Sequence, residues 1–142
     1  MEKNERILVP LDGSKCGENI LPMVEQLAER RKEGISLLRV ALAHTFPGAD
    51  QTEAQVEVVR GAEEYLHGLE GHLKAKGFDV DTHVRYGNEV EEILDHAAQK
   101  EIDLIAISTP RHRGVKHFFR GCVSEKIVRH TPKPVFLVPC SG

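Results

Sequence analysis

Short apolar runs alternate along this chain with longer segments in which apolar residues recur every three or four positions. Continuous runs such as residues 7–11 and 104–107 are typical of strands that are buried on both faces. The three-to-four spacing over residues 20–28 and 59–73 is typical of amphipathic helices. Strands joined through helices form right-handed parallel crossovers. The alternation therefore predicts an α/β fold: an open five-stranded parallel sheet with helices on both faces.

Turn and cap residues mark where these elements begin and end. Pro22 fits a helix only if that helix begins just before it, because the first backbone N–H groups of a helix have no partner. Gly34 is expected at the C-terminal end of the same helix. Thr52 and Asn88 are expected to start later helices. We expect strands over residues 7–11, 35–43, 78–86, 104–107 and 135–138, the third of them near the sheet edge.

The size and charge of the chain limit what it can do. A length of 142 residues, with no linker or low-complexity tract, predicts one domain over residues 1–142. The formal net charge of −3 argues against a general nucleic-acid or membrane-surface role. No apolar run approaches the roughly 20 residues that cross a bilayer, and the charged N-terminus does not resemble a signal peptide. We therefore expect a cytoplasmic protein.

The cysteines are three and widely spaced: Cys16, Cys122 and Cys140. They form no Cys-x-x-Cys pair, so neither a structural zinc site nor a disulfide framework is expected. Free thiols in a reducing compartment are the expectation.

Ligands of such sheets bind beyond the carboxyl ends of the strands, where the strand order reverses. Two segments meet this condition, residues 10–14 and residues 108–123. The second contains Gly121, Cys122 and Val123 at an expected helix start, where free N–H groups favour an anion. Basic side chains crowd the residues before it: Arg111, Arg113, Lys116 and Arg120.

Four segments at matching spacing carry a resemblance to a known family. Residues 8–14 read LVPLDGS, 103–107 read DLIAI, 121–130 read GCVSEKIVRH and 132–138 read PKPVFLV. Together they resemble the signatures of the universal stress protein family over essentially the whole chain. The resemblance implies a Rossmann-like, adenine nucleotide alpha hydrolase-like sheet of order 3-2-1-4-5. It also implies a homodimer, in which the last strand pairs with its twin through Val135, Phe136, Leu137 and Val138.

The family has members that bind ATP and members that do not. Binders resemble the pattern Gly-x-x-Gly, nine residues, then Gly followed by Ser or Thr. Here the corresponding positions hold Ser108, Arg111, Gly121 and Cys122, so two glycines and the hydroxyl are missing. Glycine lets backbone N–H groups approach a phosphate closely. Arginine in its place could fill the triphosphate space or neutralise phosphate with its guanidinium.

Three further positions carry over from the resemblance. Asp12 corresponds to the acid near the ribose and metal of ATP-binding relatives, and Pro10 and Val40 correspond to positions near the adenine. Each also has a purely structural explanation. Aspartate is common in turns, and Pro10 and Val40 would be favoured at a strand end and in a core without any ligand. ATP with magnesium is the cofactor that this reading would require.

Other candidate residues favour structural explanations. His112 and His117 lack a matched carboxylate or third ligand, and His67 and His72 lie on different faces of one helix, so no metal site is expected. His44 could contact a ligand because it follows the second strand. The basic segment 111–120 could touch nucleic acid, but its two phenylalanines are expected to pack beneath the loop instead.

Three readings of function remain. No catalytic residue is assigned, because no nucleophile and base stand in a coherent setting. In the first and favoured reading, this is a dimeric stress-response or signalling protein that has lost ATP and acts through partner proteins. In the second, the site altered at Arg111 still holds ATP, AMP or another anion, with slow hydrolysis at most. In the third, Cys122 at a helix start beside arginines is a redox or nucleophilic centre.

Overall fold

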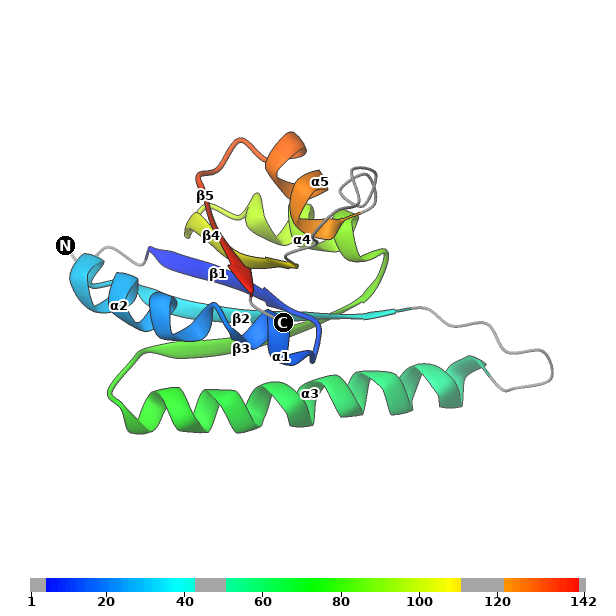
Figure 1. Ribbon diagram of the computed structural model, residues 1–142. Helices are drawn as coiled ribbons and strands as arrows, with labels where there is room; N and C mark the ends of the chain where they lie inside the picture. Colours follow the sequence, from blue (N-terminus) through cyan, green and yellow to red (C-terminus); the bar gives the residue numbers. More distant parts are fainter. Residues whose placement is uncertain (1–4, 43–50, 111–121, 141–142) are drawn as a thin grey trace.

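The computed structural model describes residues 5–42, 51–110 and 122–140. Five parallel strands form one sheet in the order β3-β2-β1-β4-β5, as the resemblance implied (Figure 1). The elements are β1 (Arg6–Leu11), α1 (Lys15–Glu18), α2 (Leu21–Arg31), β2 (Gly34–Leu42), α3 (Gln51–Ala75), β3 (Val80–Gly87), α4 (Glu89–Ala97), β4 (Ile102–Pro110), α5 (Val123–His130) and β5 (Val135–Cys140).

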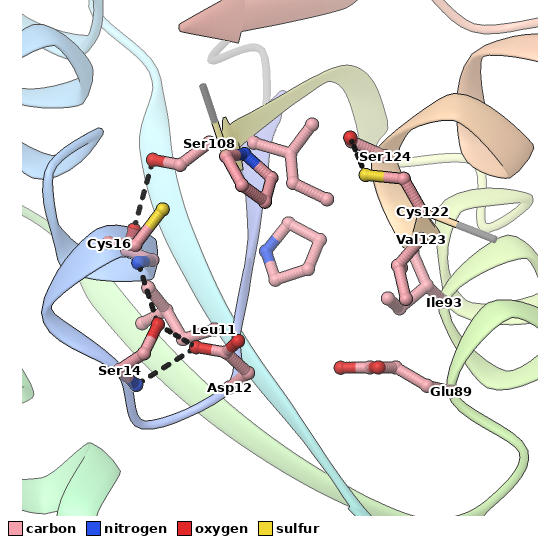
Figure 2. A pocket seen from close by; sticks show the side chains of 14 residues that line it. Leu11, Asp12, Ser14, Cys16, Glu89, Ile93, Ser108, Cys122, Val123 and Ser124 are labelled. Atoms are coloured by element: carbon pink, nitrogen blue, oxygen red, sulfur yellow. Dashed lines mark hydrogen bonds between the residues drawn. The ribbon is translucent and has the colours of Figure 1, made fainter. Parts of the chain in front are cut away.

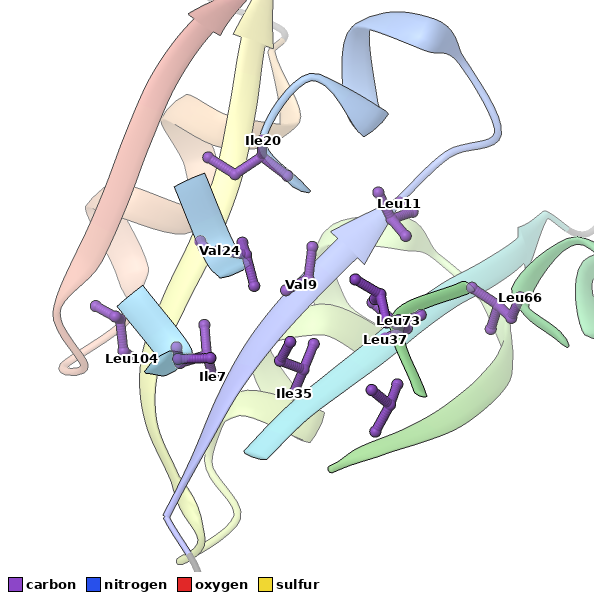
Figure 3. Packing of buried hydrophobic residues seen from close by; sticks show 13 residues of the cluster. Ile7, Val9, Leu11, Ile20, Val24, Ile35, Leu37, Leu66, Leu73 and Leu104 are labelled. Carbon is purple, nitrogen blue, oxygen red and sulfur yellow. The ribbon is translucent and has the colours of Figure 1, made fainter. Parts of the chain in front are cut away.

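Helices cover both faces of the sheet, and each face has its own hydrophobic core. Alternate residues of β1 point to opposite faces. Ile7 and Val9 pack with residues from α2 and α3 (Figure 3). Leu8 packs on the other face with residues from α4 and α5. All three side chains are fully buried. The continuous apolar runs of the sequence therefore predicted strands between two helical layers correctly.

Most helix boundaries agree with the cap residues of the sequence. Pro22 is the second residue of α2, where it removes no helical hydrogen bond. The Asn88 side chain caps α4 by accepting a hydrogen bond from the backbone N–H of Glu91 at 3.0 Å. The third strand lies at the sheet edge, as expected. Among the described residues, no helix is long and apolar enough to cross a membrane.

The expected role of Gly34 was wrong. Lys32 ends α2 in the left-handed conformation, with φ of 56°, and Gly34 is the first residue of β2. A Cβ atom at this position would lie 2.5 Å from Nη1 of Arg6, so the guanidinium would have to shift. The Arg6 guanidinium donates hydrogen bonds across the sheet to Ser36 Oγ at 2.9 Å and to Asp79 Oδ2 at 3.0 Å. Gly34 therefore serves the packing of Arg6.

Candidate functional site

The turn after β1 fixes the position of Asp12. Its Oδ1 accepts hydrogen bonds from the backbone N–H of Ser14 at 2.9 Å and from the Ser14 hydroxyl at 2.5 Å. The same hydroxyl oxygen accepts a hydrogen bond from the Gly17 N–H at 3.0 Å and so caps α1. Gly13 has φ of 88°, a conformation that favours glycine. The aspartate is therefore held at the carboxyl end of the central strand.

A cavity of about 470 Å³ lies at this edge of the sheet. Figure 2 shows its walls, with the turn after β1 and α1 on one side and the starts of α4 and α5 on the other. The cavity occupies the point where the order of strands reverses around β1, which is where the sequence placed the site. It is lined by Pro10, Leu11, Asp12, Ser14, Cys16, Gly17, Glu89, Ile93, Ile107, Ser108, Pro110, Cys122, Val123 and Ser124.

A second cavity of about 330 Å³ adjoins the first and shares Asp12 and Glu89 with it. Val40 lies in this second cavity, together with Arg39 and the neighbouring residues of β2 and α3. The Arg39 guanidinium lies 4.9 Å from the centre of the Tyr65 ring. A ligand that occupied both cavities would therefore pass between the two acidic side chains.

Asp12 and Glu89 reach toward one another across the junction of the cavities (Figure 2). Burial raises the pKa of the Glu89 carboxyl, the charge of Asp12 raises it further, and Arg39 opposes both effects. Carboxylate oxygens accept hydrogen bonds from ligand hydroxyl groups and bind hard cations. The junction is suited to either of these interactions.

The start of α5 forms the opposite wall. Cys122 is the N-cap residue, and its sulfur lies 2.9 Å from the Ser124 hydroxyl, which donates to Thr109 Oγ1 at 3.0 Å. Burial by itself would raise the pKa of the Cys122 thiol, but hydrogen bonding with the Ser124 hydroxyl, the Glu125 backbone N–H and the Thr109 hydroxyl outweighs it, so this pKa is lowered. The cavity wall therefore holds a thiol whose pKa is lowered.

Most predicted site residues come together. Pro10, Asp12, Ser108, Cys122 and Val123 line the main cavity, and Val40 lines the second. The Ser108 hydroxyl donates to the Gly17 carbonyl at 3.3 Å, which joins β4 to α1. Whether any of these residues contacts a ligand stays a prediction. Arg111, Gly121 and the loop histidines lie outside the described residues: His44, His112 and His117.

Glu89, Ile93 and Arg39 were missed by the sequence reasoning. Glu89 is the first residue of α4, where a negative charge also favours the helix start. The position of Glu89 in the sequence nevertheless indicated that it lies near Asp12. The start of α4 follows the carboxyl end of β3, which lies at the same edge of the sheet as Asp12.

The expectation of three free thiols was wrong. Cys16 and Cys140 form a disulfide, with a Cα–Cα distance of 5.4 Å, and Cys122 is the free cysteine of the described chain. The reason is topological. The bond from Ser108 to Gly17 holds α1 against β4, and Cys140 pairs with Pro110 in the neighbouring strand. Residues at opposite ends of the sequence thus become neighbours.

The strand order and the cavity at its reversal point define a Rossmann-like α/β protein. The Universal stress protein family model matches residues 3–139, and the chain belongs to that family. The resemblance drawn from the four sequence segments is confirmed.

Relatives of known name agree with this assignment. The Universal stress protein YxiE of Bacillus subtilis is 26% identical over 144 residues, covering 94% of this chain and 97% of its own. The solved structure of UspA from Lactobacillus plantarum superimposes with a TM-score of 0.79 at 22% identity, covering 97% of this chain and 99% of its own. An Arabidopsis thaliana family protein solved with AMP bound gives a TM-score of 0.71 at 14% identity, covering 97% and 93%. At such identities the structures support the fold alone.

Proposed function

We propose that this universal stress protein is a cytoplasmic regulatory protein that binds an adenine mononucleotide across its two adjoining cavities. The observation that carries the proposal is their shared boundary. Asp12 and Glu89 lie between a smaller space beside Val40 and Arg39 and a larger space that reaches the start of α5. Of the readings left open by the sequence, this arrangement favours nucleotide binding.

Each part of a nucleotide has a matching region. The family resemblance assigns Pro10 and Val40 to the base and Asp12 to the ribose, whose hydroxyl groups would donate to the carboxylate. A phosphate would lie toward Cys122 and Val123, because the first N–H groups of α5 have no intrahelical partner.

A monophosphate fits this chain better than a triphosphate. Two glycines that cradle the phosphates of ATP-binding relatives are replaced by Ser108 and Arg111, and the hydroxyl by Cys122. The Ser108 hydroxyl is engaged by the Gly17 carbonyl. Solved universal stress proteins of the same fold bind AMP, dAMP or cAMP. We therefore expect AMP to bind more tightly than MgATP.

Calorimetric titration of nucleotide-stripped protein tests the proposal. We expect AMP to bind with a Kd on the order of micromolar, and Asp12→Asn to weaken it about tenfold or more through loss of a charged hydrogen bond. Glu53→Gln removes an exposed carboxylate of α3 and serves as the matched control. If neither AMP nor MgATP produces heat up to about millimolar concentration, the protein acts without nucleotide and through partner proteins.

We also propose a homodimer formed through β5. Within the described chain this strand pairs with β4 alone, and Leu137 on it is 45% exposed. An apolar edge strand of this kind is stabilised by pairing with a second copy. Pro139 has no N–H to donate, so residues 135–138 would supply the pairing.

Light scattering distinguishes a dimer from a monomer. Leu137→Asp should convert the dimer to a monomer, because it places a charge at an apolar contact. Val56→Asp on α3, at a site that is 53% exposed, should leave the dimer intact. A monomeric wild-type protein at micromolar concentration would refute the dimer.

A further inference from the structure

Three carboxylates gather at the amino edge of the sheet, opposite the nucleotide cavities. Glu5 precedes β1, Glu33 lies between α2 and β2, and Asp103 is the second residue of β4. One side-chain oxygen from each lies within 4.8 Å of the other two. Three chain segments therefore bring negative charge to one point.

Two of these carboxylates keep a buried oxygen that no donor reaches. The Glu33 side chain is only 4% exposed, and its Oε2 has no hydrogen-bond partner. The Oδ1 atom of Asp103 is also buried and has no hydrogen-bond partner. The other oxygen of each is engaged by Arg31, at 2.6 Å from Nε to Glu33 Oε1 and 2.8 Å from Nη2 to Asp103 Oδ2. A buried acceptor without a donor is costly, so these oxygens require a positive partner.

Among the described residues, two arginines nearby do not supply one to these oxygens. Arg31 brings a single positive charge to the two carboxylates of Glu33 and Asp103, and Arg6 pairs instead with Asp79 at 3.0 Å and Asp81 at 3.3 Å. The cluster therefore holds excess negative charge that either a proton or a metal ion would relieve.

We propose that Glu5, Glu33 and Asp103 bind a hard divalent cation, with Ca²⁺ as the best fit. Carboxylate oxygens are the ligands that such ions prefer, and Ca²⁺ accepts irregular geometry with six to eight ligands. Glu5 and Glu33 border an opening of about 830 Å³, through which water could complete the coordination shell. The ion would join β1, β4 and the end of α2.

The positive charge of Arg31 and the small number of protein ligands imply weak binding. We expect a Kd of about 10⁻⁴–10⁻³ M, in the range of calcium modules with few ligands. The site lies at the opposite edge of the sheet from Asp12 and Cys122, so it does not depend on the proposed nucleotide function.

The test is a calcium titration of the full, EDTA-treated chain without nucleotide at about pH 7.5, followed by calorimetry and by the shift in Tm. We expect one saturable site and a rise in Tm. Glu33→Gln and Asp103→Asn should each weaken binding about tenfold or more. Glu29→Gln, which removes an exposed carboxylate at the same opening, should bind as the wild type does. Circular dichroism of each variant checks that it is folded.

Mn²⁺ gives a second readout by electron paramagnetic resonance, since it prefers the same oxygen ligands. Loss of the bound signal in Asp103→Asn but not in Glu29→Gln would support the site. Absence of saturable binding of either ion up to about 10 mM would overturn the proposal. Equal binding by the wild type and both cluster variants would overturn it as well.

Discussion

Cys16 in α1 and Cys140 at the end of β5 are joined by a disulfide although 124 residues separate them. Cys16 lines the main cavity, and Cys140 ends the strand proposed to form the dimer. The bond therefore ties the cavity wall covalently to the edge strand.

Reduction of this bond should destabilise the fold. Closing a loop of this length restricts the unfolded chain, and its loss should lower the free energy of unfolding by about 2–4 kcal/mol. Urea unfolding with and without dithiothreitol measures the difference. Cys140→Ser should abolish the response to the reductant, whereas Cys122→Ser should retain it. Equal urea midpoints for oxidised and reduced wild type would contradict the prediction.

The Cys122 thiol should react selectively and report on the cavity. Its lowered pKa increases the thiolate fraction near neutral pH, and the other two cysteines are bonded to each other. Under non-reducing conditions we expect a maleimide to label one thiol per native chain, and Cys122→Ser to remain unlabelled. AMP should slow labelling, because Cys122 lines the cavity. Labelling at the same rate with and without saturating AMP would place the nucleotide elsewhere.

The interior histidine should make the fold sensitive to acid. His96 is 3% exposed, and its Nδ1 accepts a hydrogen bond from Arg85 Nε at 3.0 Å. Burial lowers the pKa of His96 to about 4, with the charges of His83 and Arg85 as further causes. The unfolded state therefore binds the proton more readily, and stability that is present at pH 7 is lost as pH falls from about 6.5 toward 4.

Between pH 7 and pH 5 this group should reduce the free energy of unfolding by about 2 kcal/mol. Urea unfolding across that interval measures the slope. In His96→Gln the decrease in the free energy of unfolding between pH 7 and pH 5 should be smaller by about 2 kcal/mol. His72→Gln, which changes an exposed histidine on α3, should show the same decrease as the wild type. A His96→Gln slope equal to that of the wild type would refute the assignment.

Gly34→Ala should destabilise the protein because the new Cβ would meet the Arg6 guanidinium at 2.5 Å. We expect a loss of about 1–3 kcal/mol, typical of overpacking. Gly61→Ala on α3 has nothing within 4 Å of the added atom and should stabilise by about 0.5–1 kcal/mol through helix propensity. Thermal unfolding compares the two. If Gly34→Ala leaves Tm unchanged or raises it, the role assigned to Gly34 is wrong.

Local patterns in the sequence predicted much of the fold. Apolar periodicity distinguished strands from helices, and the residues around Pro22 and Asn88 located two helix starts to within a residue. The strand order came from the family resemblance and not from periodicity. The turn at Asp12 and the helix start at Cys122 could be placed at one edge, because parallel strands end on the same side.

By itself, then, the sequence determined the α/β class, the order of elements and the edge that carries the candidate site, since these follow from spacings within a few residues. Only the tertiary structure decided which distant side chains meet. Glu89 joined Asp12, Cys16 bonded Cys140, and Glu33 approached Asp103. Such contacts depend on strand order and on the packing of helices across the sheet. A pattern of neighbouring residues does not record that geometry, because contact between two side chains requires proximity in space and not along the chain.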